Sequence, residues 1–241
     1  MSGSPRRGAA LKYPEISLQS LVGEWWVPVV GGTVERGRLL WAVVPHVDQH
    51  PFALFATGRT ESTEHGRADY VVKPLTRQTL AHIQSAPMLP VAGMPSLPDE
   101  IKMVFRGKRR PVLVVGIAGT EVERGLRAGD ARFHTSRTLL VAPYYGAEKW
   151  RPQLIERIRR CSYPQFMWDV LPISRGERAS VLRLDHVQPI GNHAESYDLT
   201  NYKLAPDALS LVEEHLEWLR TGELPEDALL PDIRESLLGS P

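Results

Sequence analysis

The sequence predicts a mainly β protein with a C-terminal helix, in the α+β class. Three observations lead to this prediction. Short segments rich in β-branched and aromatic residues recur along the chain as far as Ile190. Clusters of Gly, Pro, Asn and Asp separate these segments at short intervals, as turns between strands do. One strong helical pattern follows, in which Leu209, Val212, Leu216 and Leu219 recur at helical spacing and form one apolar stripe.

The first half of the chain contains several predicted strands and one short predicted helix. Turn-forming segments such as GGTVERG and DQHP separate the strands. We therefore expect a small, mainly antiparallel β domain over residues 19–85, after a disordered lead over residues 1–18. The strands are expected over Gly23–Val30, Arg38–Val47, Phe52–Arg59 and Ala68–Leu75, and the helix over Thr76–Ser85.

A proline-rich segment divides the chain. Residues 86–100 hold four prolines in fifteen positions, and this composition suits a stiff connector rather than a helix or a central strand. We expect a domain boundary here. The second domain then covers residues 101–222, and residues 223–241 form a tail with one more short amphipathic turn.

The second domain begins with a predicted hairpin. Its two strands, Ile101–Phe105 and Arg110–Gly116, flank the basic turn RGKR. A long polar loop follows, and then a mixture of buried strands and helices that ends at Gly222. The strands are expected over Arg137–Gly146, within YPQFMWDVLP and over Ala179–Ile190, and the helices over Trp150–Ser162 and Ala205–Gly222.

Composition and charge exclude several classes of protein. The formal net charge of +1 excludes a generally basic nucleic-acid coat, but it permits a local basic site. No apolar run approaches the roughly 20 residues that a membrane helix needs, and the N-terminus lacks the apolar core of a signal peptide. Cys161 is the only cysteine, so the sequence offers neither an internal disulfide nor a Cys/His zinc motif. We expect a cytoplasmic protein with no membrane partner, no metal and no cofactor.

The most distinctive stretch is RGKRRPVLVVG, which runs from Arg106 to Gly116. Four cations within five residues end at Pro111 and an apolar strand. Taken alone, such a run is more often a solvated turn than a ligand site. A weaker echo, RGRLLWAVV, runs from Arg36 to Val44 and lacks the Arg-Pro pair.

The second half of the chain resembles the PemK/MazF toxins of bacterial toxin–antitoxin pairs. The resemblance rests on GKRRPVLVVG, a long loop, RTLLVAPYY, SVLRLDHVQPI and a C-terminal helix, over about residues 101–222. It implies an SH3-like barrel. The echo at Arg36 leaves two arrangements open. Either the chain is a tandem of two small barrels, the first degenerate, or residues up to about 105 are an insertion in the first loop of one barrel. We favour the tandem, because a structured loop of that size is unusual.

The resemblance also implies an activity. Members of this family are typically metal-independent ribonucleases that cut single-stranded RNA by letting the ribose 2′ hydroxyl attack the adjacent phosphate. Arg110 matches the catalytic arginine before proline, and Tyr145 falls where the family has a catalytic Thr or Ser. His186 stands at the family's glutamine position and Gln188 at its arginine position. These departures leave the activity open.

Cleavage through the 2′ hydroxyl needs a proton acceptor, a proton donor and a group that stabilises charge on the phosphorane. Arg110 suits the third role, since arginine stays protonated and donates hydrogen bonds bidentately. A histidine is the better base near neutral pH, so His134 and His186 join Tyr145 as candidate catalytic residues. The candidate RNA-binding residues are Arg106, Lys108, Arg109, Tyr144 and Gln188.

Each candidate also has a structural interpretation. His186 lies on an apolar strand and is more often a core histidine in such a place, and His134 beside a polar loop is simply exposed. Only one of Tyr144 and Tyr145 is expected to meet a ligand, because side chains alternate along a strand.

Three alternatives therefore stay open, of which the third is an ordinary structural module in a larger assembly. The first is a toxin-type endoribonuclease that acts on single-stranded RNA. The second is a non-catalytic module that binds RNA or a protein partner, such as an antitoxin-like peptide or a component of an anti-phage defence system. The resemblance implies a homodimer, or a monomer that mimics one through its N-terminal half.

Overall fold

The structure is a computed structural model that describes residues 13–61, 63–64, 66–85, 100–120, 122–127, 137–173, 178–224, 226 and 228–239. The chain divides into two compact units. The larger unit combines Met1–Val43 with Arg109–Pro241, and the smaller unit is Val44–Lys108.

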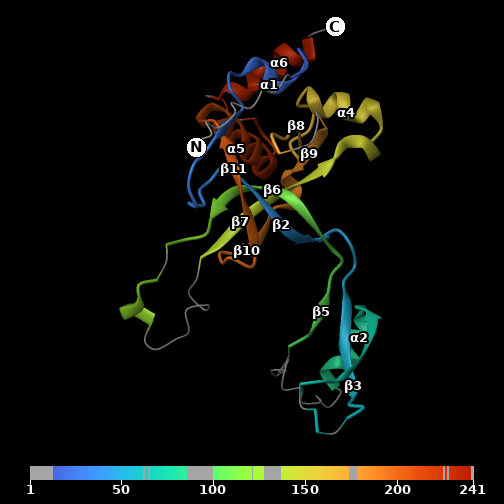
Figure 1. Ribbon diagram of the computed structural model, residues 1–241. Helices are drawn as coiled ribbons and strands as arrows, with labels where there is room; N and C mark the ends of the chain where they lie inside the picture. Colours follow the sequence, from blue (N-terminus) through green and yellow to red (C-terminus); the bar gives the residue numbers. More distant parts are fainter. Residues whose placement is uncertain are drawn as a thin grey trace, which may run out of the picture. The chain divides into compact units, whose positions relative to one another are not determined.

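The larger unit is built on one curled sheet (Figure 1). Eight strands form it within the described part of the chain, and β7 is antiparallel to each of β6, β9 and β10. The strand order is β1 (Trp26–Pro28), β11 (Tyr197–Leu204), β2 (Arg38–Pro45), β6 (Gly107–Ile117), β7 (Thr138–Gly146), β9 (Ala179–Arg183) and β8 (Phe166–Val170), and β10 (Gln188–Gly191) also pairs with β7.

Helices cover the core of the larger unit. Helix α5 (Pro206–Thr221) contributes Leu211 and Trp218 to the main core, where they pack with Leu113 of β6 and Leu182 of β9. The helices α6 (Leu229–Gly239) and α1 (Leu18–Leu21) add buried leucines to the same core and lie beside each other (Figure 1). Helix α4 (Pro152–Arg159) packs against β8. The α+β class, mainly β with C-terminal helices, is thus confirmed.

Short 3-10 helices complete the larger unit. They are η1 (Arg124–Arg127), η2 (Ala147–Lys149) and η3 (Leu184–His186). The last of these interrupts the strand predicted over Ala179–Ile190, so β9 ends at Arg183 and β10 begins at Gln188. Both strands pair with β7, and η3 lets the chain follow β7 around the bend of the sheet. Among the described helices, none has both the length and the apolar character that crossing a membrane requires.

The smaller unit is a three-stranded antiparallel sheet with one helix. Strand β3 (Phe52–Gly58) lies between β4 (Asp69–Pro74) and β5 (Met103–Val104), and helix α2 (Arg77–Ser85) follows β4. The strands predicted over 52–59 and 68–75 are confirmed here. The His46 amide donates to the Arg106 carbonyl at 2.8 Å, so the two ends of this unit lie side by side.

The pairing of β1 and β2 corrects the predicted domain boundaries. Strand β1 pairs with β11, and β2 lies between β11 and β6, so both belong to the sheet that contains β6 and β7. The chain thus follows the insertion arrangement rather than the tandem one, and the inserted unit is 44–108 rather than a domain that ends near residue 85. The two similar stretches, RGRLLWAVV and RGKRRPVLVVG, lie in neighbouring strands of one sheet, β2 and β6.

The predicted hairpin between Ile101–Phe105 and Arg110–Gly116 is wrong. The short strand β5 pairs with β3, where Met103 lies opposite Ala53. Strand β6 begins at Gly107, so the basic run lies in an extended strand rather than in a turn. The physical reason is that β2 and β7 already occupy the two edges of β6.

Helix α5 ends at a glycine with left-handed backbone. Gly222 has φ +82°, and its amide donates to the Trp218 carbonyl. An added side chain would meet nothing within 4 Å, so only the backbone conformation disfavours one. We expect Gly222→Ala to lower the free energy of unfolding by roughly 1–2 kcal/mol in urea titration. Gly23→Ala is the matched control, because Gly23 is equally uncrowded and has no left-handed φ. Equal losses in both variants would contradict the prediction.

Candidate active site

Strand pairing brings Arg110 and Tyr145 together. The register between β6 and β7 places Val112 opposite Pro143, so two residues further along each strand Arg110 lies beside Tyr145. The guanidinium carbon of Arg110 is 4.1 Å from the centroid of the Tyr145 ring. A cation over an aromatic face at this distance is an attractive contact, and it holds both side chains in place.

His186 contacts the hydroxyl end of Tyr145. The 3-10 turn η3 carries the histidine back toward β7, and only 6% of it is exposed. Its Nδ1 lies 3.0 Å from the Tyr145 hydroxyl, and the two rings meet edge to face at 5.7 Å. The structure therefore brings together three of the four candidate catalytic residues, Arg110, Tyr145 and His186. His134 lies outside the described residues.

Two further charged residues belong to this site and were not among the candidates. Arg183 Nε and Nη2 donate to the two carboxylate oxygens of Asp185 at 2.7 and 2.6 Å. The same Nη2 lies 2.6 Å from His186 Nε2. The sequence signal was the charged run RLDH, which interrupts an otherwise apolar segment. We call Arg110, Tyr145, Arg183, Asp185 and His186 the Tyr145 cluster.

The Tyr145 cluster carries an excess of positive charge. Its five members include two arginines and one carboxylate, that of Asp185. Within the described part of the chain, Arg110 Nε is buried and makes no hydrogen bond. A buried guanidinium donor without an acceptor is costly, and a bound anion supplies the missing acceptor. The cluster is therefore suited to a phosphate group.

Tyr144 faces away from the cluster and is not placed to stack on a base. Only 3% of it is exposed, and its hydroxyl donates to Asp169 at 3.1 Å. The candidate RNA-binding role of Tyr144 is therefore corrected. The alternation of the strand explains this, since the neighbouring Tyr145 lies on the opposite face.

The remaining candidates have other surroundings. Gln188 is buried, and its amide lies 3.4 Å from the His186 carbonyl. Arg109 pairs with Asp198 at 2.7 Å and lies 4.8 Å from the Trp41 ring centroid. Arg106 and Lys108 are exposed in the smaller unit. Of the five predicted RNA-binding residues, Gln188 thus contacts the Tyr145 cluster, through the His186 carbonyl.

A buried carboxylate, Asp169, is a second feature that the sequence did not predict. Desolvation raises the pKa of Asp169 to about 7, although the hydrogen bonds that it accepts act in the opposite direction. Tyr13 belongs to the segment predicted as a disordered lead, and its hydroxyl is 3.4 Å from this carboxylate. The other donors are Trp25 Nε1 and Trp26 Nε1, each at 3.3 Å, the Tyr144 hydroxyl and the Val170 amide at 2.7 Å.

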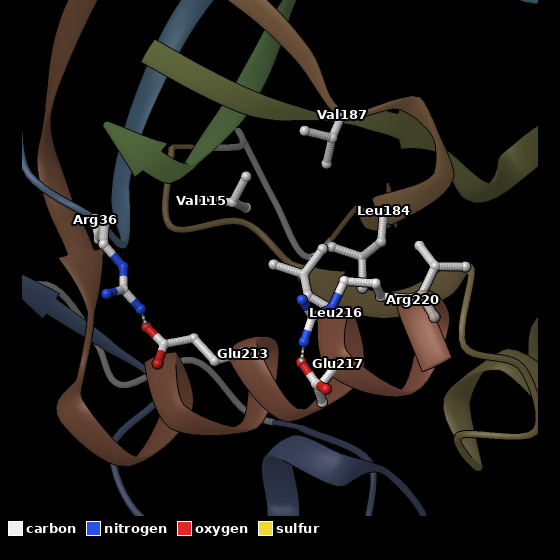
Figure 2. A pocket seen from close by; sticks show the side chains of 9 residues that line it. Arg36, Val115, Leu184, Val187, Glu213, Leu216, Glu217 and Arg220 are labelled. Atoms are coloured by element: carbon white, nitrogen blue, oxygen red, sulfur yellow. Dashed lines mark hydrogen bonds and ion pairs between the residues drawn. The ribbon is translucent and has the colours of Figure 1, made fainter. Parts of the chain in front are cut away.

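A separate hollow of about 450 Å³ lies between α5 and the sheet (Figure 2). Figure 2 shows two ion pairs at its rim, one between Arg36 and Glu213 and the other between Arg220 and Glu217. Because each arginine already has a carboxylate partner, this hollow suits an anion less well than the Tyr145 cluster does. Its floor is aliphatic, formed by Val115, Leu184, Val187, Leu216 and Leu219.

Comparisons with known proteins add no identification. No family model matches the chain, and neither the curated proteins nor the solved structures contain a match. In the parts of the chain that the structure describes, no group of three or more His, Cys, Asp or Glu side chains is placed to hold a metal ion.

Proposed function

We propose that this protein is a metal-independent endoribonuclease that acts on single-stranded RNA, similar to the PemK/MazF toxins, and that its curled sheet is an SH3-like barrel of that type. One observation carries the proposal. The Arg110 guanidinium lies 4.1 Å from the ring of Tyr145, whose hydroxyl is 3.0 Å from His186 Nδ1. A phosphate-binding cation and two groups that exchange protons are thereby in one place.

Three members of the Tyr145 cluster have a direct role in the proposed reaction. Arg110 neutralises the phosphate and stabilises the charge that develops on the phosphorane. Tyr145 lies next to that cation, and its hydroxyl donates a proton to the leaving 5′ oxygen as the bond between phosphorus and that oxygen breaks. The proton of the attacking 2′ hydroxyl passes to solvent water, and the Tyr145 phenolate regains a proton from water. His186 contacts the hydroxyl and orients it. In this proposal the phenol of Tyr145 replaces the shorter hydroxyl of Thr or Ser at the same strand position.

A non-catalytic RNA-binding or partner-binding module is the second candidate. One observation favours it: both ring nitrogens of His186 already contact protein groups, Nδ1 with Tyr145 and Nε2 with Arg183. A histidine in this arrangement takes up a further proton only if the Arg183 contact breaks. This second function retains the phosphate contacts and involves no proton transfer. For either function we propose a cytoplasmic setting in a toxin–antitoxin or defence system.

Cleavage of RNA in EDTA tests the proposal. The full chain is incubated with a mixed-sequence single-stranded RNA and with the matching DNA, and the products are resolved on a denaturing gel. We expect cleavage of the RNA alone, with a 2′,3′-cyclic phosphate at the new end, because only RNA has the attacking 2′ hydroxyl. Cleavage of the DNA as well as the RNA would contradict this mechanism.

An RNA that stays intact at high protein concentration overturns the endoribonuclease proposal. Binding of the same RNA, titrated against salt, then decides the second candidate. A negative slope of log affinity against log salt that becomes shallower in Arg110→Ala supports an RNA-binding module. A slope near zero, or one that Arg110→Ala leaves unchanged, contradicts phosphate binding by the cluster.

A further inference from the structure

The contact between Arg183 and His186 determines where the histidine proton lies. A guanidinium group only donates hydrogen bonds, and it keeps its charge throughout the usual pH range. Arg183 Nη2 has two hydrogens. One is directed to Asp185 Oδ2 at 2.6 Å, and the other to His186 Nε2, also at 2.6 Å. His186 Nε2 must therefore be the acceptor in this pair, and it carries no proton.

A neutral imidazole with a bare Nε2 carries its proton on Nδ1. Nδ1 is the nitrogen that lies 3.0 Å from the Tyr145 hydroxyl oxygen. The Nδ1 hydrogen is thus donated to that oxygen, so the phenolic proton of Tyr145 is directed to a partner other than His186. The opposite tautomer would point an Nε2 hydrogen at a guanidinium nitrogen, which cannot accept it.

Asp185 holds the arginine in the position that this arrangement needs. The carboxylate accepts two parallel hydrogen bonds from Arg183, and this forked pairing fixes the plane of the guanidinium group. The side chains of Arg183 and Asp185 are only 20% and 27% exposed, so solvent screens the pair less than it screens a surface pair. The guanidinium group of Arg183 also lies 5.0 Å from the ring centroid of Phe166, which is the residue opposite Arg183 on the neighbouring strand β8.

We propose that Arg183 and Asp185 are positioning residues that lock His186 in the Nδ1-protonated form and thereby present the Tyr145 hydroxyl proton to a phosphate oxygen of bound RNA. The second half of this statement rests on the proposed function, and the first half does not. The chain of contacts runs from Asp185 through Arg183 and His186 to Tyr145. It sets the direction of one hydrogen bond at the site where a phosphate would lie.

Nitrogen NMR of the full chain, labelled with ¹⁵N-histidine, tests the tautomer. The His186 signals are assigned by their loss in His186→Gln. We expect a long-range ¹H–¹⁵N spectrum at neutral pH to show His186 Nε2 at the shift of an unprotonated nitrogen and Nδ1 at that of a protonated one. A protonated Nε2 in the wild type overturns the inference, whether or not RNA is cleaved.

Variants show whether Arg183 is the cause. In Arg183→Met we expect the His186 tautomer to switch to Nε2-protonated, and in Asp185→Asn we expect a mixture of the two tautomers. Arg109→Met is the matched control, because Arg109 also pairs with an aspartate, and its guanidinium group lies over the ring of Trp41. An unchanged tautomer in a folded Arg183→Met overturns the inference. If that variant does not fold, Arg183→Gln is used in its place, because the amide oxygen of glutamine can accept a hydrogen bond from Nε2.

RNA binding tests the second half of the proposal, in which the Tyr145 hydroxyl donates its proton to a phosphate oxygen. The probe is a single-stranded RNA whose 2′ oxygens are methylated, so that it binds but is not cleaved. We expect Tyr145→Phe to weaken its binding about tenfold, as the loss of a hydrogen bond to a charged group does. In the Arg183→Met background the same substitution should change affinity by less than about threefold, because Tyr145 then donates to His186. Equal effects in both backgrounds overturn this half.

The outcomes separate the two proposals. The expected tautomer with no RNA binding supports the lock on His186 and overturns the proposed function. RNA cleavage that depends on Arg110, together with a protonated Nε2, supports the proposed function and overturns the lock.

Discussion

Replacing Arg110 with alanine is expected to lower the rate of RNA cleavage by about a hundredfold or more. The loss of one preorganised donor to a developing oxyanion costs roughly that factor. Arg110 combines a charge, a buried Nε without a protein acceptor in the described chain and a fixed place beside Tyr145. Initial rates on a single-stranded RNA in EDTA measure the effect.

Arg220→Ala is the matched control for this substitution. Arg220 lies on α5, carries the same charge and forms an exposed ion pair with Glu217. We expect its removal to change the cleavage rate by less than about threefold, as an exposed ion pair contributes little. Arg110→Lys should resemble Arg110→Ala, because a lysine keeps the charge and loses the forked donor geometry. Equal losses in the Arg220 and Arg110 variants would show that only net charge matters.

Asp169→Leu is expected to lower the free energy of unfolding by roughly 3–5 kcal/mol. Leucine branches at the same carbon atom, is larger, and accepts no hydrogen bond. It would leave the donors of Trp25, Trp26 and Tyr144 buried without a partner. Urea unfolding followed by tryptophan fluorescence measures the loss. Asp198→Leu, at an exposed aspartate on the same sheet, is the control and should change little.

The raised pKa of Asp169 predicts the direction in which stability changes with pH. Its pKa is raised to about 7 in the folded protein from 3.8, so between these values the folded state holds more protons than the unfolded state. The contribution of this group to stability is therefore complete below about pH 4 and is lost as pH rises toward 7, by up to about 1.4 kcal/mol per pH unit.

The comparison of wild type with Asp169→Asn isolates this effect, because asparagine does not titrate and the rest of the chain is shared. The titratable groups that face the carboxyl are the hydroxyls of Tyr13 and Tyr144, whose pKa values are raised by burial, so they stay protonated in this range. We expect the wild type to lose stability relative to Asp169→Asn between pH 5 and pH 7.5. If the free energies of unfolding of the wild type and Asp169→Asn change with pH in the same way, the raised pKa of Asp169 is contradicted.

Local sequence patterns predicted most elements of the fold. Alternating residues with turn-forming ends located β3, β4 and β7, and the leucine stripe with a terminal glycine located α5. Strand pairing was not predictable in the same way. The partner of β1 is β11, and no local pattern near Trp26 indicates that strand Tyr197–Leu204 will lie beside it.

The candidate site was also predicted only in part, because some of its contacts depend on how distant segments fold together. Arg110 and Tyr145 came from a resemblance, and the β6–β7 register explains why they meet. Arg183 and Asp185 were missed because their role depends on the turn η3, which the sequence presented as continuous strand. Asp169 was missed for a different reason. Its donors come from segments that are far apart along the chain, so no spacing relates Tyr13 to Tyr144 or to the two tryptophans.

The insertion of the smaller unit between β2 and β6 has a consequence for the order of folding. These strands neighbour each other in the sheet, and the Gly37 amide donates to the Val114 carbonyl at 2.8 Å. Joining them directly requires closure of a long loop, which slows folding. A smaller unit that folds first brings His46 and Arg106 within one hydrogen bond of each other. The loop that must close between β2 and β6 is then effectively short, so we expect the folded smaller unit to speed the pairing of these two strands.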